Sequence, residues 1–189
     1  MVAYGSTGSV DYVSPGVVLK KPHIAIGKTT VDKLRTNCFA VERKILERLS
    51  HHPRIVRFLG AQGMSLLLGE ANRGDLQDYL IAHPDIPVAQ RLAWCRQITE
   101  AIEYIHGHGV IHSDLRPGNI LVHESAPGSL DLQLCDFGGA VCEELGVDGQ
   151  SLPDGPFYSP VFKYEMNTLS DIFGLGLCHV HHHHGQVAL

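Results

Sequence analysis

The sequence HSDLRPGNILV, at residues 112–122, decides the fold and concentrates polar side chains in one place. Asp114, Arg116 and Asn119 supply a carboxylate, a fixed cation and a carboxamide within six positions. A proline and a glycine in the middle of the stretch disfavour a helix, so these polar residues are predicted to lie on a loop. The apolar run that follows, residues 120–122, predicts a strand that anchors the loop.

A second apolar run, residues 130–134, comes after a short turn and ends in the sequence DFG, which begins at Asp136. Two strands joined by a turn would bring Asp114, Asn119 and Asp136 to one end of a small ribbon. An Asp that accepts a proton, together with an Asn and an Asp that hold a divalent cation, is the set that phosphoryl transfer requires. The two runs therefore predict a phosphoryl-transfer site.

This pair of motifs resembles the catalytic loop, H-R-D-L-x-x-x-N, and the metal loop, D-F-G, of eukaryotic protein kinases. The resemblance implies that Asp114 orients or deprotonates the attacking hydroxyl. It implies that Asn119 and Asp136 hold Mg²⁺ on the β- and γ-phosphates of ATP. Arg116 stands where many serine/threonine kinases place a lysine near the γ-phosphate, and we count it with Asp114 as a catalytic candidate. His112 is expected to support the loop by packing and hydrogen bonding, not to act as a base.

The N-terminal residues resemble the glycine-rich loop of the same family, G-x-G-x-x-G-x-V. Gly5 and Gly8 fill the second and third glycine positions, Val10 fills the valine that covers the base, and Ala3 replaces the first glycine. Glycines allow backbone N–H groups to approach phosphates closely. The alternative is an ordinary Gly-Ser turn between two strands.

Residues 17–20 read V-V-L-K, which resembles the third kinase strand and assigns Lys20 to the α- and β-phosphates. A helix is predicted over residues 37–50, with Glu42 inside its apolar stripe. A buried carboxylate needs a cationic partner, and Lys20 is the candidate. The alternatives are that Lys20 is a surface lysine, that Lys21 takes its place, or that Glu42 pairs with a neighbouring cation in water.

A short buried strand at residues 65–68 precedes a segment that resembles the linker between kinase lobes. The resemblance implies that the backbone of Gly69 and Ala71 bonds the adenine edge, that Leu68 closes the back of the pocket, and that Asp75 meets the ribose. The alternative for Asp75 is an ordinary turn and helix N-cap.

A longer helix is predicted over residues 88–108, and it is expected to buttress the loop. Trp94 on this helix is expected to pack in the core. Downstream, the sequence SDIFGLG at residues 170–176 resembles a kinase helix whose Asp171 bonds the backbone of the catalytic loop. The predicted buried stripe of the longer helix comprises Val88, Leu92, Cys95, Ile98, Ile102 and Ile105.

The composition narrows the function classes. The net charge of −5 gives no basic footprint for nucleic acid or for an anionic membrane. The five cysteines show no metal-binding spacing and predict reduced thiols of a cytoplasmic or nuclear protein. No signal peptide and no apolar run of membrane-spanning length is expected.

The sequence departs from the family pattern at two positions, and the first departure carries a prediction about regulation. Ser113 replaces the arginine that pairs with a phosphorylated activation segment in many kinases, so we expect activity without phosphorylation of residues 139–157. A strong effect of phosphatase treatment on activity would contradict this hypothesis. The sequence YSPV at residues 158–161 stands where the family has A-P-E, with Val161 in place of the glutamate.

The predicted fold is α+β and two-lobed, with a small antiparallel sheet and one helix in the first lobe and a mainly helical second lobe, truncated after the start of the helix that carries Asp171. The His-rich end could be weak nickel or zinc ligands, a tag, or coding sequence read out of frame. The predicted divisions are a kinase-like domain at 1–177 (first lobe 1–68, linker 69–75, partial second lobe 76–177) and a non-homologous tail at 178–189.

The predicted activity is ATP- and Mg²⁺-dependent transfer of the γ-phosphate to a protein Ser or Thr hydroxyl. A non-enzymatic ATP-binding or scaffold domain of the pseudokinase type, impaired by truncation, is the alternative, and a small-molecule kinase of similar fold is a third option. The expected partner is a protein substrate, with no nucleic acid and no membrane. The sequence does not specify the oligomeric state.

Overall fold

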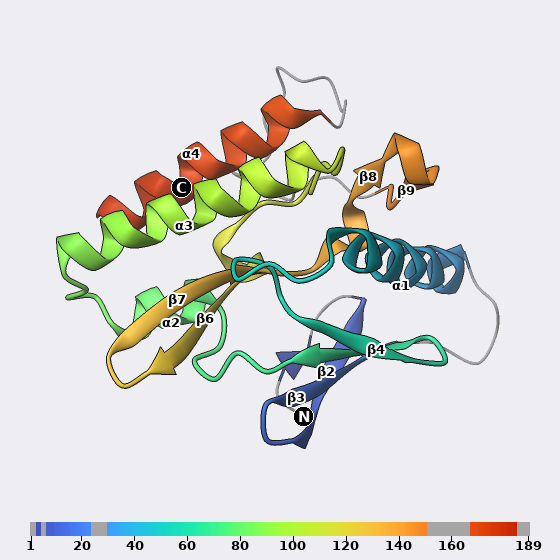
Figure 1. Cartoon of the computed structure of the whole chain (residues 1–189), viewed down its shortest axis with the longest axis horizontal. Helices are drawn as coiled ribbons and strands as arrows, with labels where there is room; N and C mark the ends of the chain where they lie inside the picture. The colour runs from blue at the N-terminus through green and yellow to red at the C-terminus, as the bar shows by residue number, and fades with distance from the viewer. Residues whose placement is uncertain (1–2, 5–6, 24–29, 151–166, 185–189) are drawn as a thin grey trace.

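The computed structural model describes residues 3–4, 7–23, 30–150 and 167–184 (Figure 1). It has a small sheet lobe at the N-terminal end and a mainly helical lobe, with α1 (Thr30–Leu49) beside the sheet. This arrangement confirms the predicted α+β class. Gly5 and the sequence at residues 158–161 lie outside the described residues.

The sheet of the first lobe is antiparallel, with the strand order β1-β2-β3-β5-β4. The predicted strands at residues 17–20 and 65–68 are confirmed, and the β-branched valines of the first favour a half-buried pleated surface. The strand at residues 58–62 was not predicted. The turn between β2 and β3 places Gly16 at a φ of +79°, a conformation that glycine adopts without strain. The bounds are β1 (Ala3–Tyr4), β2 (Gly8–Ser14), β3 (Val17–Pro22), β4 (Phe58–Gln62) and β5 (Ser65–Gly69).

Helix α1 begins at Thr30, seven residues before the predicted start, and ends at Leu49. The apolar residues of its first turns, Val31 and Leu34, are exposed and lie outside the buried stripe from which the helix was predicted, so the prediction began too late. Asp32 in the first turn favours the helix through the dipole. The face toward the core comprises Cys38, Phe39, Val41, Glu42, Ile45, Leu46 and Leu49.

The second lobe contains α2 (Leu76–Ala82), α3 (Val88–Gly107) and α4 (Thr168–His184), and Figure 1 shows α3 and α4 side by side. The bounds of α3 agree with the prediction, but part of its predicted stripe is wrong. Val88 and Leu92 are 65% and 49% exposed, whereas Trp94 is completely buried. Trp94 Nε1 and Gln90 Nε2 both donate to the carbonyl of Leu130, so α3 contacts this strand through the face that carries Gln90 and Trp94. The helix α4 runs through the histidines to His184.

Two short ribbons follow α3, and the polar loop at residues 112–119 connects α3 to the first of them. Strands β6 (Ile120–Ala126) and β7 (Ser129–Leu134) are antiparallel, as the sequence predicts, and Ile120 pairs with Leu134. Strands β8 (Val141–Cys142) and β9 (Val147–Asp148) form the second ribbon. One turn of 3-10 helix, Pro117–Asn119, leads into β6, and another, Phe137–Gly139, follows β7. A turn of 3-10 helix therefore precedes β6 and another follows β7, next to Asn119 and Asp136 respectively.

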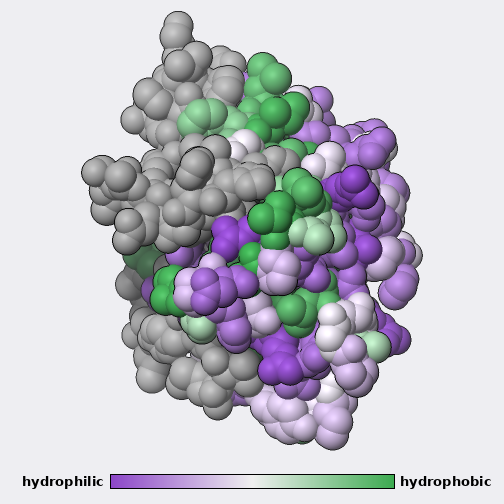
Figure 2. All heavy atoms as spheres, turned by 90° about the vertical axis from the view of Figure 1, so that its left-hand side faces the viewer, coloured by the Kyte–Doolittle hydropathy of each residue, from purple (hydrophilic) through white to green (hydrophobic). Residues whose placement is uncertain are grey.

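The molecular surface mixes apolar and polar patches. The ends of α2 and α3 lie on the left of Figure 1, and Figure 2 shows that face with separate green patches among purple ones. Within the described ranges, no helix combines the length and apolar character needed to cross a membrane.

Candidate active site

Three charged side chains from three elements meet beside the sheet. Lys20 Nζ on β3 lies 2.6 Å from Glu42 Oε2 on α1 and 2.8 Å from Asp136 Oδ1, which follows β7. The predicted pairing of Lys20 with Glu42 is therefore confirmed. Lys21 points to the other face of the strand and pairs with Asp11. We call Lys20, Glu42 and Asp136 the charged triad.

The alternatives for these residues are wrong for a clear reason. The Lys20 side chain is 11% exposed and the Glu42 side chain 1% exposed, so neither is a surface group. Arg43, the cation next to Glu42 in sequence, pairs instead with Glu47 one turn along α1. A carboxylate as buried as Glu42 is stabilised in its charged form mainly by its contact with Lys20.

Burial and ion pairing shift the pKa values of the triad in different directions. Burial raises the pKa of Glu42, and the nearby charge of Lys20 opposes that rise. The Asp136 carboxylate is 40% exposed, and the charge of Lys20 lowers its pKa below the usual value. Burial disfavours the charge on Lys20, but Asp136 and Glu42 outweigh burial and raise its pKa. Lys20 is therefore cationic at neutral pH.

The backbone around Asp136 holds its carboxylate in place. Asp136 has a φ of +61°, in the left-handed region, which is uncommon for a residue with a side chain. The next residue, Phe137, is completely buried, and the ring of His112 packs against it edge-on with centroids 5.0 Å apart. His112 Nε2 lies 2.9 Å from the carbonyl oxygen of Cys135. The supporting role predicted for His112 is confirmed.

The catalytic loop gathers Asp114, Arg116 and Asn119. Asn119 Nδ2 donates to Asp114 Oδ2 at 2.8 Å, and Arg116 Nε lies 3.4 Å from the same oxygen. The other oxygen, Asp114 Oδ1, is buried and has no hydrogen-bond partner among the described atoms. Burial raises the pKa of Asp114, and Arg116 opposes the rise. Asn119 thus fixes one oxygen of Asp114, while the other is buried without a partner among the described atoms.

Asp171 on α4 fixes the backbone of this loop. The amides of His112 and Ser113 donate to its two carboxylate oxygens at 2.8 and 2.9 Å, as the resemblance implies. Ser113 takes a φ of +69° to make this contact. The sequence analysis missed His106, whose Nε2 lies 2.9 Å from Asp171 Oδ2. The sequence feature that could have indicated this contact is the position of His106, directly after the buried Ile105 at the end of α3.

The loop and the triad are joined by a backbone contact. The amide of Cys135 donates to the carbonyl of Asn119 at 3.0 Å, one residue before Asp136. The two predicted metal ligands therefore lie at the same end of the β6–β7 ribbon. No group of three or more His, Cys, Asp or Glu in the described ranges could form a metal site. A carboxylate and a carboxamide oxygen fit Mg²⁺, which keeps water and substrate phosphates as its remaining ligands.

The first strands contribute Gly8 and Val10, two of the residues that are predicted to contact the nucleotide. Val10 pairs with Lys20 across β2 and β3. A Cβ atom on Gly8 would lie 2.3 Å from the carbonyl oxygen of Lys21 and 2.9 Å from the Phe39 ring. Strand packing alone therefore requires a glycine at position 8, and its proposed role at a phosphate is additional.

The substitution Gly8→Ala is expected to destabilise the protein by about 1–3 kcal/mol, because the methyl group overpacks the sheet. Urea unfolding measures this change. Gly107→Ala is the matched control, since nothing lies within 4 Å of its added Cβ, and alanine favours a helix over glycine. Equal stability of Gly8→Ala and wild type would show that the sheet does not need this glycine.

The predicted linker residues lie at the junction of the lobes. Leu68 is buried in β5, and the Gly69 amide donates to the carbonyl of Arg57 at 2.7 Å, so only the Gly69 carbonyl is left for a ligand edge. Ala71 is half-buried, two residues after the end of β5. Asp75 caps α2 by accepting from the amide of Asp78. The cap reading of Asp75 is thus confirmed, and contact with a ribose stays a prediction.

Comparison with known proteins supplies the family context. The family model described as "Protein kinase domain" matches residues 5–187. Serine/threonine-protein kinase RAD53 of Saccharomyces cerevisiae is 36% identical over 109 residues, which are 56% of this chain and 13% of that protein. Human serine/threonine-protein kinase ULK1 is 31% identical over 170 residues, 84% of this chain and 15% of that protein. The chain thus spans about a seventh of the length of these relatives.

A solved structure supports the fold. The crystal structure of the Rad53 kinase domain and SCD2 matches with a TM-score of 0.65 at 23% identity, and the match covers 96% of this chain and 65% of that one. The predicted two-lobed fold is confirmed by this similarity.

Proposed function

The chain belongs to the protein kinase family, and from that premise we propose that it transfers the γ-phosphate of ATP, with Mg²⁺, to a Ser or Thr hydroxyl of a protein. The observation that carries the proposal is the meeting of the charged triad with Asp114 and Asn119 at one end of the β6–β7 ribbon. The preference for Ser or Thr rests on the D-L-R-P-G-N sequence and on the similarity to serine/threonine kinases.

In the proposed reaction the substrate oxygen forms a bond to the γ-phosphorus while the bond to the β-bridging oxygen breaks, and ADP leaves. The hydroxyl proton passes to the carboxylate of Asp114, whose side chain is 19% exposed. Arg116 lies beside Asp114 and places a fixed positive charge near the transferred group. Bound Mg²⁺ would neutralise charge on the phosphates, and Asn119 and Asp136 would hold it.

The remaining residues bind and orient the nucleotide in this proposal. Lys20 contacts the α- and β-phosphates, and Glu42 holds Lys20 in position from α1. Gly8, Val10 and Gly5 cover the phosphates and base. Leu68, Gly69, Ala71 and Asp75 line the adenine and ribose side.

The test is transfer of ³²P from γ-labelled ATP to a generic protein substrate, with and without Mg²⁺. We expect labelled Ser or Thr only when the metal is present, and EDTA should abolish the transfer. A melting curve that ATP raises, without any transfer, would support a non-enzymatic ATP-binding domain instead. Failure of ATP to shift the melting curve, with no transfer, would overturn both functions.

A further inference from the structure

Residues 54–56 run along the outer edge of β7, on the side opposite to β6. Ile55 and Leu134 form a parallel bridge. The amide of Leu134 donates to the carbonyl of Arg54 at 2.8 Å, and the amide of Val56 donates to the carbonyl of Leu134 at 2.9 Å. Both polar backbone groups of Leu134 are therefore held by this segment, two residues before Asp136.

The side chain of Arg54 makes a second contact with β7, in addition to the main-chain hydrogen bond. Its Nη1 donates to Asp131 Oδ1 at 2.9 Å, and its Nε donates to Glu100 Oε2 on α3 at 3.0 Å. Asp131 lies on β7, so one residue contacts the strand through its main chain and through its guanidinium. The two Arg54–carboxylate contacts lie on different nitrogens of one planar group, which fixes its orientation.

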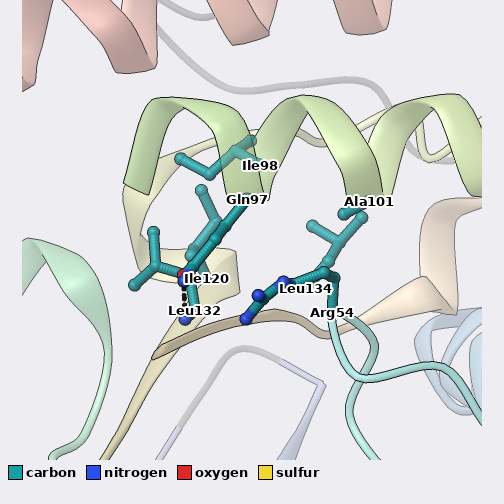
Figure 3. A pocket seen from close by; sticks show the side chains of 7 residues that line it. All are labelled: Arg54, Gln97, Ile98, Ala101, Ile120, Leu132 and Leu134. Atoms are coloured by element: carbon teal, nitrogen blue, oxygen red, sulfur yellow. Dashed lines mark hydrogen bonds between the residues drawn. The ribbon is translucent and has the colours of Figure 1, made fainter. Parts of the chain in front are cut away.

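Asp131 is the centre of this network. Gln97 Nε2 and Ser125 Oγ donate to its two oxygens, each at 2.8 Å. Gln97 Oε1 accepts from the amide of Leu132 at 2.8 Å. Figure 3 shows Arg54 and Gln97 beside apolar side chains of α3, β6 and β7, with the Gln97–Leu132 bond dashed. The Arg54 side chain is 20% exposed and that of Asp131 28%, so solvent screens the pair only in part.

The position of Arg54 in the chain links this network to the charged triad. Helix α1, which carries Glu42, ends at Leu49, and the segment from there to Arg54 connects it to β7. At the other end, β7 delivers Asp136, which contacts Lys20, the partner of Glu42. A shift of Arg54 along β7 would therefore displace Asp136 relative to Glu42 and Lys20.

We propose that Arg54, oriented by Asp131, is a positioning residue that sets the place of Asp136 relative to α1 and so tunes metal affinity. The proposal rests on the proposed function for the role of Asp136 as a metal ligand. An ordinary surface ion pair would affect only stability, and by little. Groups that orient a metal ligand affect metal affinity or activity by about 10–100-fold when they are removed.

The test compares Arg54→Gln, Asp131→Asn and the double variant with Arg43→Gln. The control removes the Arg43–Glu47 pair, an exposed ion pair of α1 that does not contact β7. Three quantities are measured for each: the apparent KM for Mg²⁺, kcat, and the affinity for Mn²⁺ with a non-hydrolysable ATP analogue by electron paramagnetic resonance. Emission of Trp94, the single tryptophan, which contacts Leu130, checks that α3 still packs on β7.

We expect Arg54→Gln and Asp131→Asn each to weaken Mn²⁺ binding and to raise the Mg²⁺ KM about 10-fold, with a smaller change in kcat. The double variant should be no worse than the single ones, because both remove the same contact. Arg54→Lys, which keeps the charge, should restore part of the affinity. Wild-type-like Mn²⁺ affinity in Arg54→Gln and Asp131→Asn would overturn the proposal.

The metal-binding measurement separates this proposal from the proposed function. If the wild type binds Mn²⁺ and nucleotide but transfers no phosphate, the kinase function fails while the positioning role is still tested. If Arg54→Gln does not fold, Asp131→Asn supplies the same comparison, because it removes the other partner of the same contact.

Discussion

Asp114→Asn is expected to lower the rate of phosphoryl transfer about 10²–10⁴-fold while ATP binding stays near that of the wild type. The substitution keeps the size of the side chain, and its carbonyl oxygen can still accept from Asn119 Nδ2. It removes the carboxylate oxygen that is buried without a partner and replaces it with a group that cannot take a proton. The measurement is kcat from ³²P transfer at saturating ATP, with thermal shift to follow binding.

The pH profile gives a second readout for Asp114. Burial raises the pKa of this carboxyl group, and the base must be ionised to accept a proton. Activity should therefore be present above this raised pKa and be lost as the pH falls through it, at a higher pH than an exposed Asp would give. The control is Asp85→Asn, the same change at an exposed position before α3, which should leave kcat unchanged. Wild-type turnover by Asp114→Asn would exclude Asp114 as the base.

The sequence predicts the parts of the site that depend on spacing along the chain. Asp114 and Asn119 are five residues apart on a loop with a proline, and their side chains meet. The burial of Glu42 inside an apolar stripe required a cation, and Lys20 supplies it. These contacts follow from local pattern and from the cost of a buried charge.

Contacts that depend on how elements cross could not be predicted. The second partner of Lys20, Asp136, depends on the left-handed φ of a residue outside any regular element. Arg54 meets Asp131 because a loop runs beside β7, and neither residue belongs to a recognisable pattern. The exposure of Val88 was missed because periodicity shows which face of a helix is apolar, but not where the neighbouring strand ends.

Lys20→Met is expected to abolish most of the turnover, about 10²–10³-fold, and to destabilise the protein at neutral pH by about 3–5 kcal/mol. The first effect follows from losing the cation that would contact the phosphates. The second follows because Glu42, 1% exposed and with Oε1 already without a partner in the described part of the chain, would remain buried without its counter-ion. Urea unfolding at pH 7 and ³²P transfer measure the two effects.

The pH dependence of stability identifies the unpaired carboxylate as the cause. Burial already raises the pKa of Glu42, and removal of Lys20 would raise it further. A carboxyl group with a raised pKa in the folded state stabilises the protein at low pH, and this stabilisation is lost as the pH rises through that pKa. Lys20 lowers the pKa of Asp136, so the wild type gains stability above the usual pKa of that group, and the variant loses this gain.

The change at Glu42 makes Lys20→Met lose less stability at pH 5 than at pH 8, relative to the wild type at the same two values. The loss at Asp136 is the same at both pH values, because both lie above the usual pKa of that group. The double variant Lys20→Met/Glu42→Gln should recover much of the lost stability at pH 8, because no unpaired charge then remains at position 42. It should not recover turnover, since the phosphate contact is still absent. A stability loss in Lys20→Met that is independent of pH, and that Glu42→Gln does not relieve, would show that packing of the lysine stem, and not the buried carboxylate, accounts for the effect.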